Sequence, residues 1–105
     1  MVTIDSNNTT YDAVSTTVAT AQTNRDMKAN ETALFRNVDR ARFLRLTTDQ
    51  TITIRFNSTA MPGIIMTSTE SPRVWKRTDE SLEIKNIYMT NASGSTANIK
   101  AELYL

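Results

Sequence analysis

The sequence predicts an all-β fold: a small antiparallel β-sandwich or barrel that follows a polar, extended N-terminal arm. Turn-forming residues recur about every ten residues from Ala33 onward, with no long helical pattern between them. Two segments alternate apolar and polar residues with a period of two, as half-buried strands do. Only 39% of the residues are hydrophobic, and abundant threonine suits a pleated surface. A chain of 105 residues has room for one domain.

Residues 1–32 form the predicted arm, which is extended or partly helical. Large apolar groups are scarce there, and Tyr11 is the only aromatic residue. Tyr11, Val14, Val18 and Ala21 fall at helical spacing, but threonine weakens that pattern. Two interpretations stay open. The segment is loosely attached, or it orders on a neighbouring subunit, where residues 2–4 would add a strand to a sheet edge.

Residues 33–105 form the predicted β-domain. Its first large apolar groups lie in 33–38 and 40–47. Residues 50–57 alternate cleanly, with Ile52, Ile54 and Phe56 on one face. Further strands are expected at 64–69 and 74–78, after a loop at 57–63 and a turn at 70–73. A turn is expected before residue 50, where the Asp49 side chain would hydrogen-bond to nearby backbone. Three methionines are expected in the core: Met61, Met66 and Met89.

The chain closes with a predicted β-hairpin at 86–105. Its last strand places five apolar residues on one face: Ala97, Ile99, Ala101, Leu103 and Leu105. The turn suits Gly94 at a position that requires a positive φ. Tyr88 and Tyr104 would share the more polar face as a cross-strand pair. We therefore expect the C-terminus to be tied into the sheet.

The residue types that are missing exclude several kinds of chemistry. The chain has no cysteine and no histidine, which removes disulfides, Cys/His zinc sites and histidine-based triads. Its net charge is +1, and no apolar run approaches the roughly 20 residues of a membrane span. We expect no enzyme activity, no cofactor, no metal, no nucleic-acid partner and no membrane partner. The N-terminus lacks the pattern of a signal peptide, so assembly in a cytoplasm is expected.

Asp79, Glu80 and Glu83 form the only acidic cluster. Three carboxylates could hold Ca²⁺ or act in acid–base chemistry, as in a carboxylate-based hydrolase. No glycine-containing ligand loop surrounds them, so a solvated turn is the preferred interpretation.

The densest basic run holds Arg36, Arg40, Arg42 and Arg45. On a strand the first three would share one face, and Arg45 would not. Such a run suits a protein interface, a nucleic-acid groove or an ordinary charged surface. Trp75, the single tryptophan, is either a core anchor or an interface hot spot, and the core is preferred.

The segments "TITIRFNS" and "NIYMTNASGSTANIKAELYL" resemble small virion structural proteins of tailed bacteriophages. Domains of phage heads and tails often end in a similar Asn-Ile-Tyr-x-Thr-Asn-x-Ser-Gly sequence. The resemblance covers roughly residues 40–105. It implies a β-sandwich that belongs to the virion and binds other virion subunits.

A short chain with an arm and a sandwich best fits a head decoration (cement) protein, which implies a homotrimer on the major capsid protein. A neck, tail or fibre component is the alternative, as is a receptor- or glycan-binding module that uses exposed aromatic residues. The interface residues expected from the sequence are Arg36, Arg40, Arg42, Trp75, Tyr88 and Tyr104.

Overall fold

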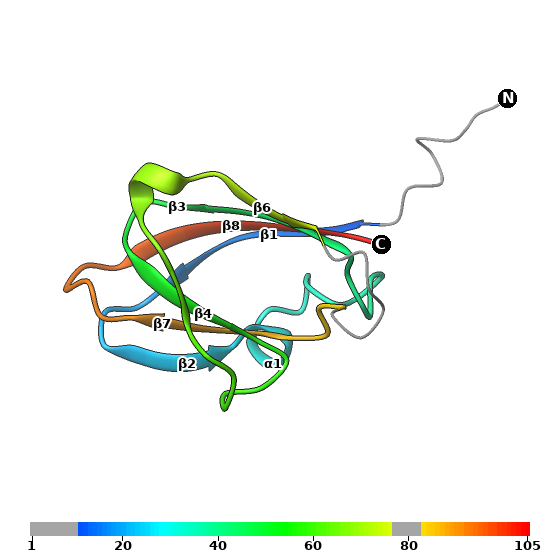
Figure 1. The fold of residues 1–105 in the computed structure, drawn as a ribbon, viewed down its shortest axis with the longest axis horizontal. Coiled ribbons are helices and arrows are strands. Elements are labelled where there is room, and N and C mark those ends of the chain that lie inside the picture. Colours follow the sequence, from blue (N-terminus) through cyan, green and yellow to red (C-terminus); the bar gives the residue numbers. More distant parts are fainter. Residues whose placement is uncertain (1–10, 77–82) are drawn as a thin grey trace, which may run out of the picture.

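The computed structural model describes residues 11–76 and 83–105, which form two antiparallel sheets of four strands each (Figure 1). The predicted all-β class is thus confirmed. Sheet A has the order β1 (Tyr11–Val18), β8 (Ala97–Tyr104), β3 (Phe43–Thr48) and β6 (Arg73–Lys76). Sheet B has the order β2 (Gln22–Asp26), β7 (Ile87–Asn91), β4 (Ile52–Phe56) and β5 (Ile64–Met66). The helices described are α1 (Met27–Asn30) and the 3₁₀ turn η2 (Ser68–Glu70).

The strand pairings are nested along the chain. β1 pairs with β8, β2 with β7, β3 with β6, and β4 with β5. Two further pairings join these strand pairs into sheets: β3 also pairs with β8, and β4 also pairs with β7. These eight strands have the connectivity of a jelly roll.

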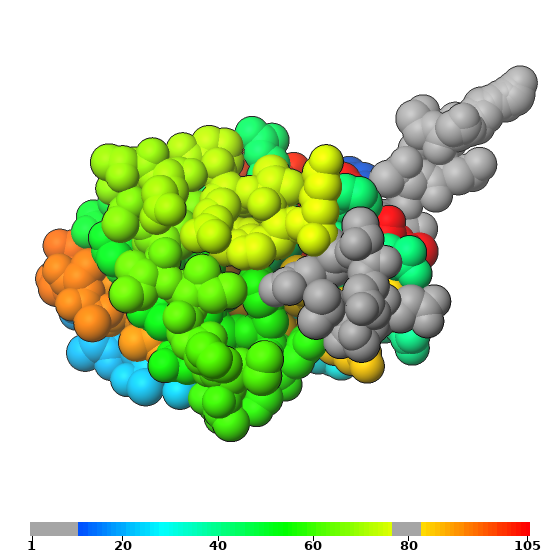
Figure 2. All heavy atoms as spheres, viewed as in Figure 1, coloured from blue at the N-terminus to red at the C-terminus, as the bar shows by residue number. Residues whose placement is uncertain are grey.

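The hydrophobic core lies between the two sheets. Leu44 and Leu103 contribute from sheet A, and Ile54 and Met89 from sheet B; all four are fully buried. The alternation predicted for β4 is confirmed, because Ile52, Ile54 and Phe56 point into the core. In Figure 2 the segment from β4 to β6, coloured green to yellow, covers much of the face that is viewed. This segment includes the connection from β5 to β6.

The predicted closing hairpin is wrong, because β7 and β8 belong to different sheets. The connection between them crosses the sandwich, and the fully buried Asn91 holds it. The Asn91 side-chain amide donates to the carbonyls of Val18 and Ser95, and its oxygen accepts from the Ser93 backbone. Gly94 has φ +88°, as expected. β8 is a central strand, so the expected attachment of the C-terminal segment to a sheet is confirmed.

The boundary of the predicted arm is wrong for residues 11–32, because β1 and β2 are strands of the two sheets. Residues in β1 alternate in exposure with a period of two, not with the helical spacing suggested by Tyr11 and Val14. Residues 1–10, including the strand suggested at 2–4, lie outside the described residues.

A buried carboxylate explains why this strand belongs to the fold. Asp12 is 4% exposed and points inward, where an apolar residue would be expected. It accepts hydrogen bonds from the backbone N–H groups of Arg36 (2.9 Å), Asn37 (2.9 Å) and Val38 (2.8 Å). The first strand is therefore tied to the segment that follows α1.

Residues 33–42 contain turns and bends and no strand longer than the isolated Ala41–Ile84 bridge. The strand predicted at 64–69 ends at Met66, where η2 follows. Met66 and Met89 lie in the core as predicted, but Met61 is 50% exposed. Among the described residues, no helix is long and apolar enough to cross a membrane.

Candidate interaction surface

The outer face of sheet A, which points away from the core, gathers exposed apolar side chains at one end. The strand register places Tyr11 beside Tyr104 and Tyr104 beside Phe43. The exposed fractions are 55% for Tyr11, 39% for Phe43, 52% for Val74 and 58% for Leu105. We call this group the aromatic patch: Tyr11, Phe43, Val74, Tyr104 and Leu105.

The aromatic patch is hollowed as well as apolar. A groove of about 350 Å³ runs over it, lined by Phe43, Leu44, Arg45, Val74, Tyr104 and Leu105. At the patch's edge the rings of Tyr11 and Tyr104 stack, with centroids 5.8 Å apart and planes inclined by 27°. A concave apolar surface with rigid aromatic walls is suited to receive a side chain of another molecule.

One ion pair borders the patch. Glu102 accepts a hydrogen bond from the Tyr104 hydroxyl at 3.1 Å, and its other oxygen lies 3.6 Å from the Arg45 guanidinium. Partial burial raises the pKa of Tyr104 above 10.0, and the hydrogen bond to Glu102 and the negative charge of Glu102 add to that rise. The Tyr104 phenol therefore stays neutral to a higher pH than an ordinary tyrosine, and its hydroxyl is held by the hydrogen bond to Glu102.

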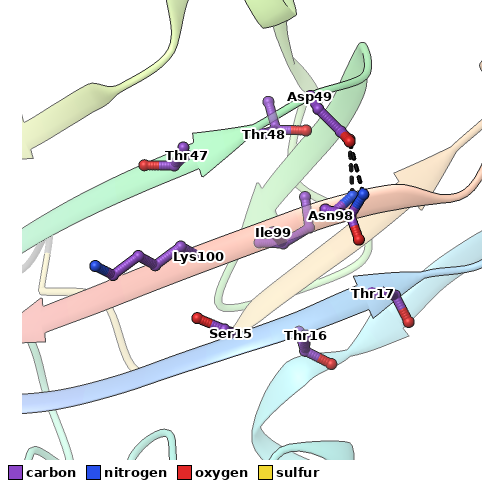
Figure 3. Close-up of a pocket in the computed structure, with 9 residues that line it drawn as sticks. All are labelled: Ser15, Thr16, Thr17, Thr47, Thr48, Asp49, Asn98, Ile99 and Lys100. Carbon is purple, nitrogen blue, oxygen red and sulfur yellow. Dashed lines mark hydrogen bonds between the residues drawn. The ribbon is translucent and has the colours of Figure 1, made fainter.

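The other half of the face is polar. A second hollow of about 440 Å³ lies across β1, β8 and β3, lined by Ser15, Thr16, Thr17, Thr47, Thr48, Asp49, Asn98, Ile99 and Lys100 (Figure 3). The Asp49 carboxylate accepts from the Asn98 backbone at 2.8 Å and from its side-chain amide at 2.7 Å. These bonds lower the pKa of Asp49. Asp49 thus holds β8, where the sequence had predicted a bond to its own turn.

The predicted interface residues do not lie on one surface. Of the two tyrosines, only Tyr104 lies in the aromatic patch; Tyr88 belongs to β7 in sheet B, so the predicted Tyr88–Tyr104 pair is wrong. Trp75 is 9% exposed and packs edge-on against Phe56, with ring centroids 5.6 Å apart. Trp75 therefore occupies the core, the interpretation that the sequence favoured.

The predicted shared strand face of Arg36, Arg40 and Arg42 is also wrong, because residues 36–42 are not a strand. Arg40 and Arg42 instead lie near Glu83, at 3.7 and 3.4 Å. Glu83 is 5% exposed, so the solvated-turn interpretation fails for this residue. Its carboxylate is engaged by two guanidinium groups. Asp79 and Glu80 lie outside the described residues.

Tyr11, Phe43 and Val74 were not predicted to be surface residues. Leu105 was expected on the core face of the last strand, and that prediction is wrong, because the residue follows the end of β8 and is 58% exposed. Phe43, Arg45 and Thr47 alternate with buried neighbours in β3, but that signal depends on knowing where the strand begins. In the described part of the chain, no group of three His, Cys, Asp or Glu residues could hold a metal ion. Comparisons with protein-family models, curated proteins and solved structures found no match.

Proposed function

We propose that this chain is a non-enzymatic structural subunit of a phage virion, and specifically a decoration (cement) protein that binds capsid subunits through the aromatic patch. The observation that carries the proposal is an apolar, concave surface on a sheet face that would otherwise be wetted. Two further arguments support it. The sequence resembles virion proteins of tailed phages, and the jelly-roll connectivity is one that viral capsid domains use. The connectivity is an argument by analogy, because one fold serves many functions.

The size of the patch fits a contact that is repeated many times. Four side chains that are 39–58% exposed present on the order of 300–400 Å² of surface. A stable interface buries about 800 Å² on each partner, so the patch would form its centre, and the polar half of the face would form its rim. Many such contacts around a shell add up, even where each is weak. The proposed partner is the major capsid protein, and the proposed location is the virion, assembled in the host cytoplasm.

A binding assay with matched surface variants tests the proposal. Purified capsids without this chain are mixed with the wild type, with Phe43→Ser/Val74→Ser, and with the control Ile65→Ser, and co-sedimentation is measured. Ile65 is 64% exposed and belongs to sheet B, so its change removes similar apolar area elsewhere. We expect the double variant to bind at least about tenfold more weakly and the control to bind like the wild type. Equal binding by all three proteins, or a loss in the control alone, would contradict the assignment of the surface.

A glycan-binding module is the second candidate, and the polar hollow favours it. The hollow is lined by the Asp49–Asn98 pair and by Ser15 and Thr47, which both lie beside Lys100 in the strand register. Jelly rolls also occur among lectins. A glycan array with the wild type and with Asp49→Ala tests this candidate. Binding that Asp49→Ala abolishes would support it, and a lack of binding to any glycan would end it.

A further inference from the structure

The edge strands of the two sheets differ in how they are protected from pairing with another chain. The edges are β1 and β6 in sheet A and β2 and β5 in sheet B. β6 has four residues, is charged at both ends and follows Pro72, while β5 has three residues and follows Pro62 and Gly63. A register shift interrupts β2 between Gln22 and Arg25. Short length, charge, proline and bulges are the devices that keep an edge strand from pairing.

β1 lacks short length, proline and a bulge, and Asp12 is its one charged residue. It runs for eight residues without proline, glycine, lysine or arginine. Its register with β8 is unbroken from the Tyr11–Tyr104 pair to the Val18–Ala97 pair. Alternate backbone groups of an edge strand point away from its neighbour. Among the described residues, no hydrogen bond joins the backbone of residues 11–17 to a segment other than β8.

The side chains of β1 also allow a second β1 to approach. Those on the outer face are exposed and uncharged: Tyr11, Ala13, Ser15 and Thr17. Asp12, the one charged residue, points inward and is engaged by backbone N–H groups, among them that of Val38. On the outer face, therefore, no charged side chain of one β1 opposes a charged side chain of the other β1. Of the edges described, β1 of a second copy is the one that matches β1 in length and lack of protection.

We propose that β1 pairs antiparallel with β1 of a second copy around a two-fold axis at Ser15. Ser15 would then face Ser15 of the second copy, and Ala13 would face Thr17. The two sheets A would join into one sheet of eight strands, with both aromatic patches on the same side. Such an interface is isologous and closes as a dimer, whereas a trimer would need β1 to pair with a different edge. The pairing is a property of the chain in solution and does not depend on the proposed virion function.

Sedimentation velocity and light scattering of the full chain test the pairing. We expect a mass of twice 11.8 kDa for the wild type. Ser15→Lys places two lysines opposite each other and should raise the dissociation constant at least about tenfold. Val74→Lys is the matched control, because Val74 is exposed on the outer face at the opposite edge of sheet A. It should leave the dimer intact. An equimolar mixture of Ser15→Lys and Ser15→Glu should recover it, because opposite charges then meet at the axis.

Far-UV circular dichroism confirms that each variant is folded, and Ala13→Lys with Ala13→Glu replaces the Ser15 pair if either fails to fold. Four results would each overturn the proposal: a wild type that is monomeric at about 100 µM, a dimer that survives Ser15→Lys, a dimer that Val74→Lys dissociates, or a mass of three chains. Loss of the dimer on deletion of residues 1–10, with Ser15→Lys still dimeric, would assign the contact to the N-terminal segment instead.

Discussion

Tyr11 stacks on Tyr104, with ring centroids 5.8 Å apart, so the first strand described is joined to the last one at the edge of the aromatic patch. The backbones of β1 and β8 are paired along their whole length, and the stacked rings add a side-chain contact on the outer face. This contact links the architecture to the proposed function, because the same two rings help to form the surface that a neighbouring subunit would meet.

A double-mutant cycle measures the stacking directly. Tyr11→Ala and Tyr104→Ala should show a coupling of about 0.5–1.5 kcal/mol in the free energy of unfolding by urea, the range for an aromatic pair. The control cycle combines Tyr11→Ala with Tyr88→Ala. Because Tyr88 lies in sheet B, those two changes should be additive. A coupling as large in the control cycle would show that the energy does not come from the stacked rings.

Replacement of Asp12 by alanine should be strongly destabilising. The substitution leaves the N–H groups of Arg36, Asn37 and Val38 without their shared acceptor. We expect a loss of about 2–4 kcal/mol in the free energy of unfolding. Asp39→Ala removes a carboxylate that is 81% exposed in the same segment, and should change stability by less than about 0.5 kcal/mol. Similar losses in both variants would mean that Asp12 does not anchor the segment.

Trp75 should behave as a core residue. Trp75→Ala opens a cavity beside Phe56 and should cost about 3–5 kcal/mol in urea unfolding. Val74→Ala, one position along the same strand on the exposed face, should cost less than about 0.5 kcal/mol. If Trp75→Ala kept full stability and weakened only the binding of capsids, the tryptophan would belong to an interface after all.

The raised pKa of Tyr104 predicts how stability responds at alkaline pH. Because the folded state favours the neutral phenol, the stabilisation is complete below pH 10.0, the ordinary pKa of tyrosine, and is lost as the pH rises through the higher folded pKa. A spectroscopic titration of the folded wild type should show a late step, in which one tyrosine loses its proton at a higher pH than ordinary tyrosine. Tyr104→Phe should remove this step. In denaturant the wild type should titrate as ordinary tyrosine. A late step that survives in Tyr104→Phe would assign the shift to another residue.

The sequence predicted strands well where one face is buried and the other is wet. Ile52, Ile54 and Phe56 in β4 and the apolar positions of β8 alternate because the core lies on one side of each strand. Alternation does not encode which sheet a strand joins. The crossing from β7 to β8 depends on bonds from Asn91 to Val18, which is far away in the sequence. A turn-like segment such as residues 92–96 therefore suggested a hairpin.

β1 was missed for a related reason. Its inward positions include Asp12 and the half-buried Thr16, so the apolar pattern of a strand is broken. The partners that make these polar groups acceptable lie in another part of the chain: Val38 donates to Asp12, and Thr16 donates to Glu31. The aromatic patch could not be predicted either, since it needs the pairing of Tyr11 with Tyr104.

Sheet A is proposed to bind capsid subunits in the virion, and an electron cryomicroscopy reconstruction of the particle that contains this chain tests this binding most directly. We predict density for the two-sheet domain on the capsid surface, repeated over the shell, with Phe43 and Val74 buried against the major capsid protein. A domain found in a single ring at the neck or tail, or seated with sheet B toward the capsid and the aromatic patch in solvent, would contradict the proposal.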